Sequence, residues 1–211
     1  LAKKLYFCIL NNIAITAINN IIDLNLIASE IDHSIAHLER GEVILYPTDT
    51  VWGLGCDARN SEAIKKLYRI KERDSNKPML CMVSDMDMLK QYVDVRPEVA
   101  AYFNNISRPT TVIYPEVKGL PSKLLALDGS IAIRIVNDPF CTPLIKTFGA
   151  PIVSTSANKS QHPNPSSFEE IEDSILERVD YIVNLQSEKK LEPPSRLVKI
   201  AKDGSINILR E

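Results

Sequence analysis

Short apolar segments with the length of β-strands alternate along this chain with longer segments of helical periodicity. The expected strands lie at residues 43–46, 79–83, 111–114, 131–135, 152–155 and 181–185. The expected helices lie at residues 25–40, 61–71, 85–92, 97–104, 139–148 and 167–178. Alternation of this kind is typical of an α/β domain, in which helices pack on the faces of a sheet.

The last part of the sequence adds an antiparallel element. The segments "RLVKI" (196–200) and "INIL" (206–209) flank the pair Asp203-Gly204, and an Asp-Gly pair between two such segments predicts a β-hairpin. Strands joined by hairpins run antiparallel, whereas strands separated by a helix commonly run parallel. We therefore expect a three-layer α/β domain with a twisted sheet of mixed parallel and antiparallel strands.

The length and composition fit one folded domain. The chain has 211 residues, of which 45% are hydrophobic and 25% charged, so it can bury a substantial core. Residues 1–22 carry two lysines followed by an apolar stretch that Asn11 and Asn12 interrupt, and we interpret them as an N-terminal extension. Residues 23–211 then form a single domain.

The sequence also disfavours several classes of protein. No apolar run approaches the roughly 20 residues that cross a bilayer. The four cysteines are far apart and form no C-x-x-C pair, so the sequence predicts neither a disulfide framework nor a zinc site. A cytoplasmic location fits this use of cysteine.

Two histidines stand four residues apart, as in some metal-binding helices. His33 and His37 occur in "HSIAH", but the zinc-protease pattern requires Glu directly after the first histidine, and Ser34 occupies that position. The apolar residues of this helix define another face, so we expect both histidines to face solvent. No metal site is predicted from them.

Positive charge gathers between residues 59 and 77. This stretch has seven Lys or Arg residues and three acids, a local charge of +4 in a chain whose net charge is -2. Within it, Lys71 and Arg73 stand where the expected helix gives way to a loop before Pro78. Two interpretations remain open, a solvated helix face or a site for an anion.

Three other segments carry polar groups at the ends of expected strands. In "YPTDTVWGLGCD" (46–57), Thr48 and Thr50 offer hydroxyls, and the two glycines indicate either a turn or a close approach of a ligand. Arg134 interrupts an apolar strand, where a cation needs an anionic partner from the protein or a ligand. The segment "STSANKS" (154–160) resembles a loop that binds phosphate or ribose, although it lacks the P-loop pattern.

Together these segments resemble one known family. "YPTDTVWGLGCDA", "IKER…KP", "IAIRI" and "APIVSTSANKS" occur in the order and at the spacing of the YrdC/YciO family. The resemblance extends over about residues 25 to 210, because "PPSRLVKI…GSINILR" is similar to the closing strands of that family. The combination of K-x-R and S-x-N is its most specific part.

The resemblance implies a YrdC-like catalytic domain and a nucleotidyltransferase activity. The best-known activity of the family is threonylcarbamoyl-AMP synthase, which makes threonylcarbamoyl-adenylate and pyrophosphate from L-threonine, bicarbonate or CO2, and ATP. A partner transferase complex then modifies the adenosine beside the tRNA anticodon to threonylcarbamoyladenosine. The chain resembles the short form of the family, without the extra C-terminal domain of longer relatives. The resemblance also implies Mg2+, held mainly by the ATP phosphates.

The resemblance assigns roles by position. The signature residues that it implies to be catalytic are Lys71, Arg73, Ser156 and Asn158. The residues that it implies to face threonine are Thr48, Arg134 and Ser195. The residues that it implies to hold the nucleotide are Lys71, Ser130, Ser154, Ser156, Asn158, Asn164 and Arg210. Cations suit this chemistry, because an anionic carbamate must approach an anionic phosphate.

The chain departs from the family pattern at four positions, and these bear on threonine recognition. Arg108 stands where a glycine is common, Arg196 where a threonine is usual, Val136 where a proline is usual, and Met82 where some members have a histidine.

Two alternative functions remain open. One is a non-enzymatic RNA-binding protein of the same fold, a hypothesis that includes double-stranded RNA and a weak contact with tRNA. A pI near 6.0 and 6% aromatic residues count against a broad RNA-binding face. The other is a YciO-like paralogue that acts on another acceptor. The sequence does not predict an oligomeric state.

Overall fold

The computed structural model describes residues 23–104, 108–185, 195–201 and 203–211. The described strands are β1 (Ile44–Tyr46), β2 (Gly53–Asp57), β3 (Leu80–Val83), β4 (Thr110–Tyr114), β5 (Ile131–Ile135), β6 (Ile152–Ser156), β7 (Tyr181–Ile182), β8 (Arg196–Ile200) and β9 (Ile206–Arg210). The described α-helices are one over residues 23–39, α2 (Ser61–Ile70), α3 (Met86–Tyr92), α4 (Pro97–Asn104), α5 (Cys141–Phe148) and α6 (Asp173–Leu176). Two 3-10 helices are η1 (Ser122–Leu124) and η2 (Phe168–Glu170). The predicted N-terminal extension, residues 1–22, lies outside the described residues.

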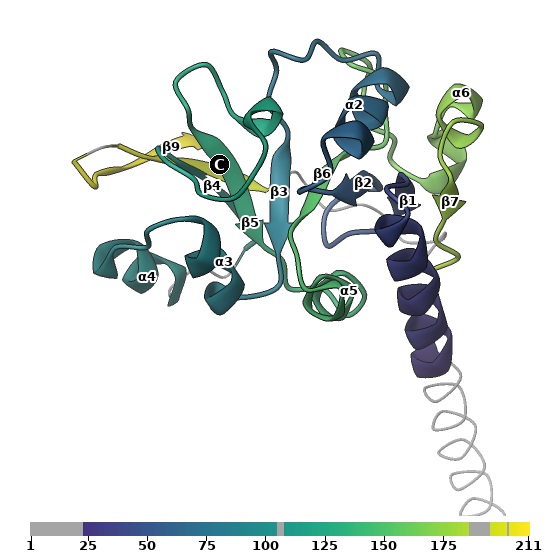
Figure 1. Ribbon diagram of the computed structural model, residues 1–211, viewed down its shortest axis with the longest axis horizontal. Helices are drawn as coiled ribbons and strands as arrows, with labels where there is room; N and C mark the ends of the chain where they lie inside the picture. The colour runs from purple at the N-terminus through teal and green to yellow at the C-terminus, as the bar shows by residue number, and fades with distance from the viewer. Residues whose placement is uncertain (1–22, 105–107, 186–194, 202) are drawn as a thin grey trace, which may run out of the picture.

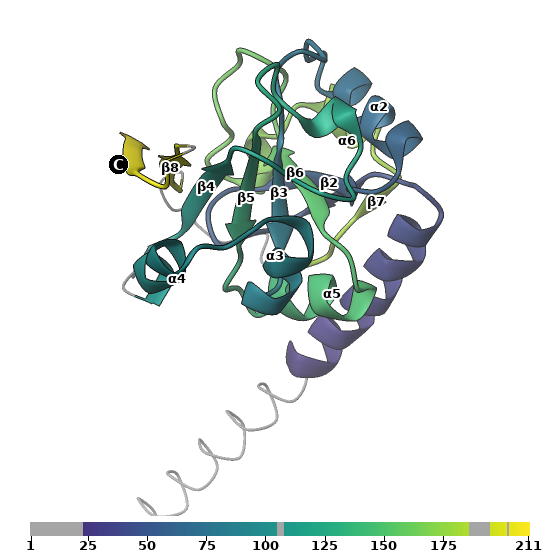
Figure 2. The same cartoon turned by 60° about the vertical axis from the view of Figure 1, so that its left-hand side comes forward.

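These strands form one sheet in the order β7-β1-β2-β6-β3-β5-β4-β8-β9. The pairs β1–β7, β3–β5 and β4–β8 are parallel, and the other neighbouring pairs are antiparallel. Figures 1 and 2 show helices flanking this sheet, with β7 at one end and the β8–β9 hairpin at the other. The predicted α/β class, the mixed sheet and the C-terminal hairpin are confirmed.

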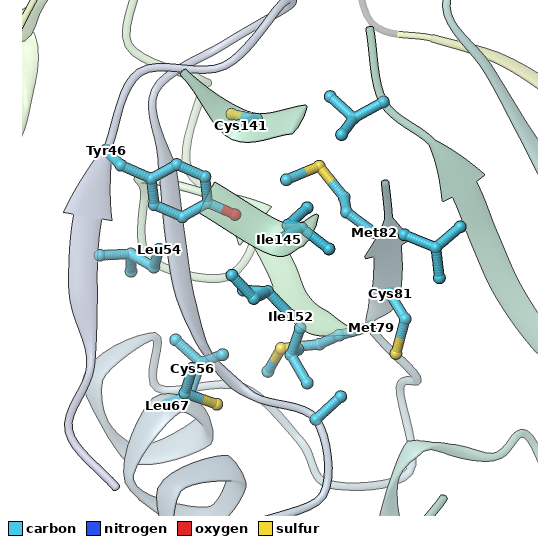
Figure 3. Close-up of a cluster of buried hydrophobic side chains, with 14 of the residues drawn as sticks. Tyr46, Leu54, Cys56, Leu67, Met79, Cys81, Met82, Cys141, Ile145 and Ile152 are labelled. Atoms are coloured by element: carbon cyan, nitrogen blue, oxygen red, sulfur yellow. The ribbon is translucent and has the colours of Figure 1, made fainter. Parts of the chain in front are cut away.

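Helix α2 is positioned by its cap and by its buried face. The side chain of Asn60 accepts hydrogen bonds from the backbone of residues 62 and 63, which satisfies two donors that a helix N-terminus leaves free. Leu67 is fully buried in the core, and Figure 3 shows it beside Cys56 of β2. These interactions fix the C-terminal end of α2, where Lys71 follows.

The segment around β2 differs from the sequence expectation. Residues Gly53–Asp57 are a strand between β1 and β6, whereas the sequence suggested a glycine turn or a ligand loop. Gly55 is required by packing, because a Cβ atom there would lie 2.7 Å from the ring of Tyr46 and 2.9 Å from the carbonyl oxygen of Val153. The glycine therefore allows close packing within the sheet.

Two other expectations are wrong. The single helix expected at 167–178 is divided into η2 and α6, and the carboxylate of Glu170 accepts a hydrogen bond from the backbone of Ser166. His37 does not simply face solvent, because it is partly buried and stacks on Tyr181 with ring centroids 4.4 Å apart.

The strand register places several predicted site residues on one face of the sheet. Ser154 of β6 pairs with Leu80 of β3, and Met82, two residues further along β3, pairs with Arg134 of β5. Paired residues point to the same face, and so do residues two apart on one strand. Side chains from β6, β3 and β5 therefore converge, although they are far apart in the sequence.

Among the described residues, no helix combines the length and the apolar character of a segment that crosses a bilayer.

Candidate active site

A cavity of about 300 Å³ lies on this face of the sheet. The predicted site residues that line it are Thr48, Arg73, Arg134, Ser154, Ser156, Asn164, Ser195 and Arg210. Three others, Lys71, Asn158 and Ser130, are not among its lining residues. The structure thus brings most of the predicted residues together, and Lys71 and Asn158 contact the lining residue Ser156.

The C-terminal end of α2 sets the positions of Lys71 and Arg73. Glu72, between them, has φ of +50°, in the left-handed region. Its N–H bonds to the carbonyl of Arg69, and the N–H of Arg73 bonds to the carbonyl of Tyr68. This pair of hydrogen bonds is the Schellman arrangement, which normally uses glycine at the left-handed position. Because of this turn, the side chains of Lys71 and Arg73 reach different parts of the structure.

Lys71 is a buried cation held by neutral oxygens. Only 1% of it is exposed, and its Nζ donates to the carbonyl oxygens of Ser156 (2.5 Å) and Asn158 (2.6 Å). A third contact reaches Oδ1 of Asn158 at 3.4 Å. Burial, reinforced by the charge of Arg73, lowers the pKa of Lys71 to about 7, whereas three acceptors favour the charged ammonium. We call Lys71, Arg73, Ser156 and Asn158 the Lys71 cluster.

The loop after β6 is built around Lys71. Ser156 Oγ donates to Oδ1 of Asn158 at 2.5 Å, and Nδ2 of Asn158 donates to the carbonyl oxygen of His162 at 2.6 Å. The N–H of Ser160 bonds to the carbonyl oxygen of Lys71 at 2.8 Å. Lys71 and Asn158 therefore shape the loop that presents Ser156 to the cavity. The interpretation of Lys71 as part of a solvated helix face is wrong.

Arg73 reaches the cavity itself. Its Nε donates to the carbonyl oxygen of Lys77 and its Nη2 to that of Pro78, both at 3.1 Å. These two bonds hold the guanidinium over the loop before β3, where it lines the cavity. Its charge is available to an anion there, because the partners of these bonds are neutral.

The cation in β5 has a different environment. Arg134 is 3% exposed, and its Nη2 lies 3.0 Å from Oδ1 of Asp49. Nη1 donates to the hydroxyl of Thr50 at 3.2 Å, and Nη2 also contacts the sulfur of Met82 at 3.1 Å. Within the described residues, Nε has no hydrogen-bond partner. We call Asp49, Thr50, Met82 and Arg134 the Arg134 cluster. The ion pair that the sequence left open is present, and the cation also lines the cavity.

The loop between β1 and β2 is organised by Thr48. Its Oγ1 donates to the carbonyl oxygen of Val51 at 2.7 Å and accepts from the N–H groups of Thr50 and Val51 at 3.1 and 3.2 Å. A hydroxyl that bonds its own backbone in this way stabilises a tight turn. Thr48 thus holds the loop that carries Asp49, in addition to lining the cavity.

The C-terminal hairpin closes part of the same cavity. Ser195 Oγ lies 2.8 Å from the hydroxyl of Thr111, and Nη2 of Arg210 donates to the carbonyl oxygen of Ser195 at 2.8 Å. On β6, Ser154 Oγ accepts a hydrogen bond from the hydroxyl of Tyr46 at 2.9 Å. Strands that are distant in the sequence therefore fix these hydroxyl groups in place.

Ser130 occupies the turn before β5. Its hydroxyl donates to the carboxylate of Asp128 at 2.5 Å, and its N–H bonds to the same carboxylate. The predicted nucleotide contact at Ser130 stays a prediction, since the residue does not line the cavity.

The residues that depart from the family pattern fall into two groups. Arg196 and Arg108 contact the carboxylate of Glu211, at 2.6 and 3.8 Å. Val136 is buried in the core. Met82 belongs to the Arg134 cluster and is fully buried, so it is the departure closest to the cation.

In the parts of the chain that the structure describes, no three His, Cys, Asp or Glu side chains lie close enough together to hold a metal ion.

Asp49 is the functional candidate that the sequence reasoning missed. It lies between two threonines that were singled out, and it supplies the anion that the buried Arg134 needs. The available signal was this need for an anion, combined with an acid in a polar loop after a strand. What the sequence could not show is that the β1–β2 loop lies beside β5.

Comparisons with known proteins identify the family of this chain. The family model Sua5/YciO/YrdC, described as "Telomere recombination", matches residues 36–211. A threonylcarbamoyl-AMP synthase of Xanthomonas campestris pv. campestris (strain B100) is 34% identical over 159 residues, which cover 74% of this chain and 85% of that protein.

Two solved structures share the fold. E. coli YciO has a TM-score of 0.74 and 26% identity, and the match covers 86% of this chain and 88% of that chain. P. abyssi Sua5 in complex with L-threonine has a TM-score of 0.74 and 21% identity, with coverage of 85% and 53%. The second similarity is evidence for the fold alone.

Proposed function

Because this chain belongs to the Sua5/YciO/YrdC family, we propose that it is an enzyme that makes threonylcarbamoyl-AMP and pyrophosphate from L-threonine, bicarbonate or CO2, and ATP. The observation that carries this proposal is a single cavity lined both by Arg73 and Ser156 and by Arg134. A reaction that joins an amino acid to a nucleotide needs cations for two different anions in one space.

The reaction has two balanced steps. The amine of threonine takes up bicarbonate with loss of water, or CO2 with loss of a proton, and becomes a carbamate. A carbamate oxygen then attacks the α-phosphorus of ATP, the bond to the β-phosphate oxygen breaks, and pyrophosphate leaves. Both reactants of the second step are anionic, so fixed positive charge lowers the repulsion and stabilises the transition state.

The Lys71 cluster is suited to the phosphates. Arg73 lines the cavity with its charge balanced only by neutral carbonyl groups. Lys71 adds a buried positive charge behind Ser156 and holds the loop that presents this hydroxyl. We assign phosphate binding to Arg73 and Ser156, and the placement of the loop to Lys71 and Asn158.

The Arg134 cluster is suited to the amino acid. Arg134 combines a charge at the cavity with an Nε–H group that has no partner among the described residues. A carboxylate bound there would gain a charge-assisted hydrogen bond. Ser195 and Thr48 line the same space. Ser154, Asn164 and Arg210 are the residues that we assign to the rest of the nucleotide.

Mg2+ belongs to this proposal as a partner of ATP. The described residues offer no cluster of acidic or histidine ligands, so the residues present fit a metal held through the phosphates of its substrate. When bound there, the ion would neutralise part of the phosphate charge.

We further propose a place for the product. A threonylcarbamoyl-adenylate is an activated acyl group, so a transferase must consume it, and the tRNA-modifying complex of the family fits that role. A cytoplasmic location and a weak contact of the basic stretch 59–77 with tRNA belong to the same proposal.

The test is amino-acid-dependent release of pyrophosphate. We expect release from ATP only when threonine and bicarbonate are both present. The similarity to E. coli YciO favours a paralogue with another acceptor as the second candidate. Pyrophosphate release that is indifferent to threonine and bicarbonate, in folded protein, would favour this second candidate. RNA binding without any turnover of ATP would favour a non-enzymatic protein.

A further inference from the structure

The two buried cations beside the cavity differ in their counter-charges. Arg134 lies 3.0 Å from the carboxylate of Asp49, so the Arg134 cluster has a net charge near zero. Lys71 and Arg73 donate instead to carbonyl oxygens, which leave their charges uncompensated. Beside the cavity, the Lys71 cluster is therefore positive and the Arg134 cluster is close to neutral.

The Asp49–Arg134 pair is poorly screened. The side chains of Asp49 and Arg134 are 12% and 4% exposed, so water and salt reduce their electrostatic interactions only weakly. The turn held by Thr48 and the strand β5 fix the two groups in place. Arg134 lines the cavity and Asp49 does not, so a ligand in the cavity reaches the guanidinium and is affected by the carboxylate through its weakly screened charge.

We propose that Asp49 selects the charge of the ligand, so that this side of the cavity prefers a zwitterionic amino acid to an anion of the same size. The inference rests on the proposed function. A zwitterion is complementary to an Arg–Asp pair, because its carboxylate faces the guanidinium while its ammonium offsets the aspartate. A ligand that has the carboxylate without the ammonium is repelled by Asp49 and gains nothing in return.

Arg134 has separate nitrogen atoms for Asp49 and for a ligand carboxylate. Asp49 contacts Nη2, whereas Nε has no partner within the described residues, so a ligand carboxylate need not displace Asp49. The selection also has a consequence for the reaction. The bound ammonium first loses a proton to solvent. When the resulting amine becomes a carbamate, Asp49 repels the new negative charge and the Lys71 cluster attracts it. The product of the first step is thereby directed toward the phosphates.

The experiment compares two ligands of the same size. Calorimetry without ATP measures the Kd of threonine and of 2,3-dihydroxybutanoate of the same configuration, in which a hydroxyl replaces the ammonium. We expect wild-type protein to bind threonine at least tenfold more tightly. Asp49→Asn should reduce this ratio at least tenfold, and Asp49→Glu should retain most of it. The matched control is Asp57→Asn, which removes a similarly buried carboxylate that pairs with Arg59 at 3.0 Å and does not line the cavity, and it should leave the ratio unchanged.

The ratio separates charge selection from a purely structural role. If Asp49 only holds Arg134 in place, Asp49→Asn weakens both ligands equally, and an unchanged ratio overturns the proposal. If Asp49→Asn fails to fold, Asp49→Ser serves as the second neutral variant. In wild-type protein, equal Kd values for the two ligands would overturn the proposal without any variant. Failure of wild-type protein to bind threonine counts instead against the proposed function.

Discussion

Lys71 and Arg134 are both almost completely buried beside one cavity, yet the protein satisfies their charges in different ways. The ammonium of Lys71 is surrounded by carbonyl and amide oxygens of the loop after β6. The guanidinium of Arg134 has a carboxylate partner in Asp49, with a hydroxyl and a thioether beside it. One site compensates charge with dipoles and the other with an opposite charge.

Under the proposed function, this difference would let one cavity accept both a polyphosphate and a zwitterionic amino acid. Dipoles offset the cost of burying a cation but leave its net charge, which attracts a polyphosphate. A carboxylate partner cancels that charge and leaves a local pair of opposite signs, which suits a zwitterion. The loop dipoles also make Lys71 a structural centre, so its loss affects folding as well as catalysis.

The largest expected effect follows from removal of Lys71. We expect Lys71→Met to lower kcat about a hundredfold or more, which corresponds to about 3 kcal/mol of transition-state stabilisation. The carbonyl oxygens of Ser156 and Asn158 would lose their buried partner, so the free energy of unfolding should fall by about 2–3 kcal/mol. Pyrophosphate release and urea denaturation measure the two effects.

The control for this prediction is another lysine of the same basic stretch. Lys65 is 43% exposed at its side chain and contacts Glu62 on the surface. Lys65→Met should leave kcat within about threefold and stability within about 0.5 kcal/mol. Equal activity of the two variants would contradict the special role of Lys71.

Removal of Arg134 tests the other side of the comparison. Arg134→Met should weaken threonine binding by about 1.5–3 kcal/mol, the usual contribution of a charge-assisted hydrogen bond, with little change in ATP affinity. Because this change removes the cation beside the carboxylate of Asp49, the double variant Arg134→Met/Asp49→Asn provides the matched, uncharged background. Calorimetry with each ligand measures the effect. Loss of ATP binding with threonine binding intact would assign Arg134 to the nucleotide.

The pH dependence of stability tests the state of Lys71. Burial, with a contribution from Arg73, lowers its pKa from 10.5 to about 7, so between these values the unfolded chain binds more protons than the folded protein. The free energy of unfolding should therefore rise with pH in this window. We expect the gain between pH 6.5 and pH 9 to exceed that of Lys71→Met by on the order of 1 kcal/mol. Identical pH profiles would mean that the loop oxygens keep the ammonium charged throughout.

Much of the fold could be predicted because its strands are short apolar runs with clear boundaries. The strand β2 was missed, since two glycines in five residues resemble a turn, and the close approach of Tyr46 to Gly55 is a tertiary feature. The helix expected at 167–178 was also wrong. Ser167 followed by Glu170 has the spacing of a capping box, but this local pattern did not decide the backbone there.

The candidate site could be located from the sequence, but the division of its roles could not. Lys71 and Arg73 are equivalent in a sequence pattern, and only the left-handed Glu72 places one of them inside the loop and the other at the cavity. The two shorter hydrogen bonds of Lys71 go to backbone carbonyl groups of Ser156 and Asn158, and backbone groups carry no sequence signal. Pairing of Asp49 with Arg134 depends on the folded sheet.

The smallest expected effect concerns Glu72, whose backbone creates the difference between Lys71 and Arg73. A residue with a Cβ atom is disfavoured in the left-handed region, so Glu72→Gly should be more stable than Glu72→Ala by about 1 kcal/mol. Both variants lose the same contacts with Arg178 (3.2 Å) and Lys159 (3.4 Å), which involve exposed groups and contribute little. Urea denaturation of the two variants therefore measures the free-energy cost of the left-handed backbone conformation at residue 72.

We expect kcat of both Glu72 variants to stay within about threefold of wild type. The turn itself, held by hydrogen bonds to the carbonyls of residues 68 and 69, positions the cations. A large loss of kcat in Glu72→Gly, with unchanged stability, would show instead that the side chain of Glu72 holds the Lys71 cluster in place through Lys159.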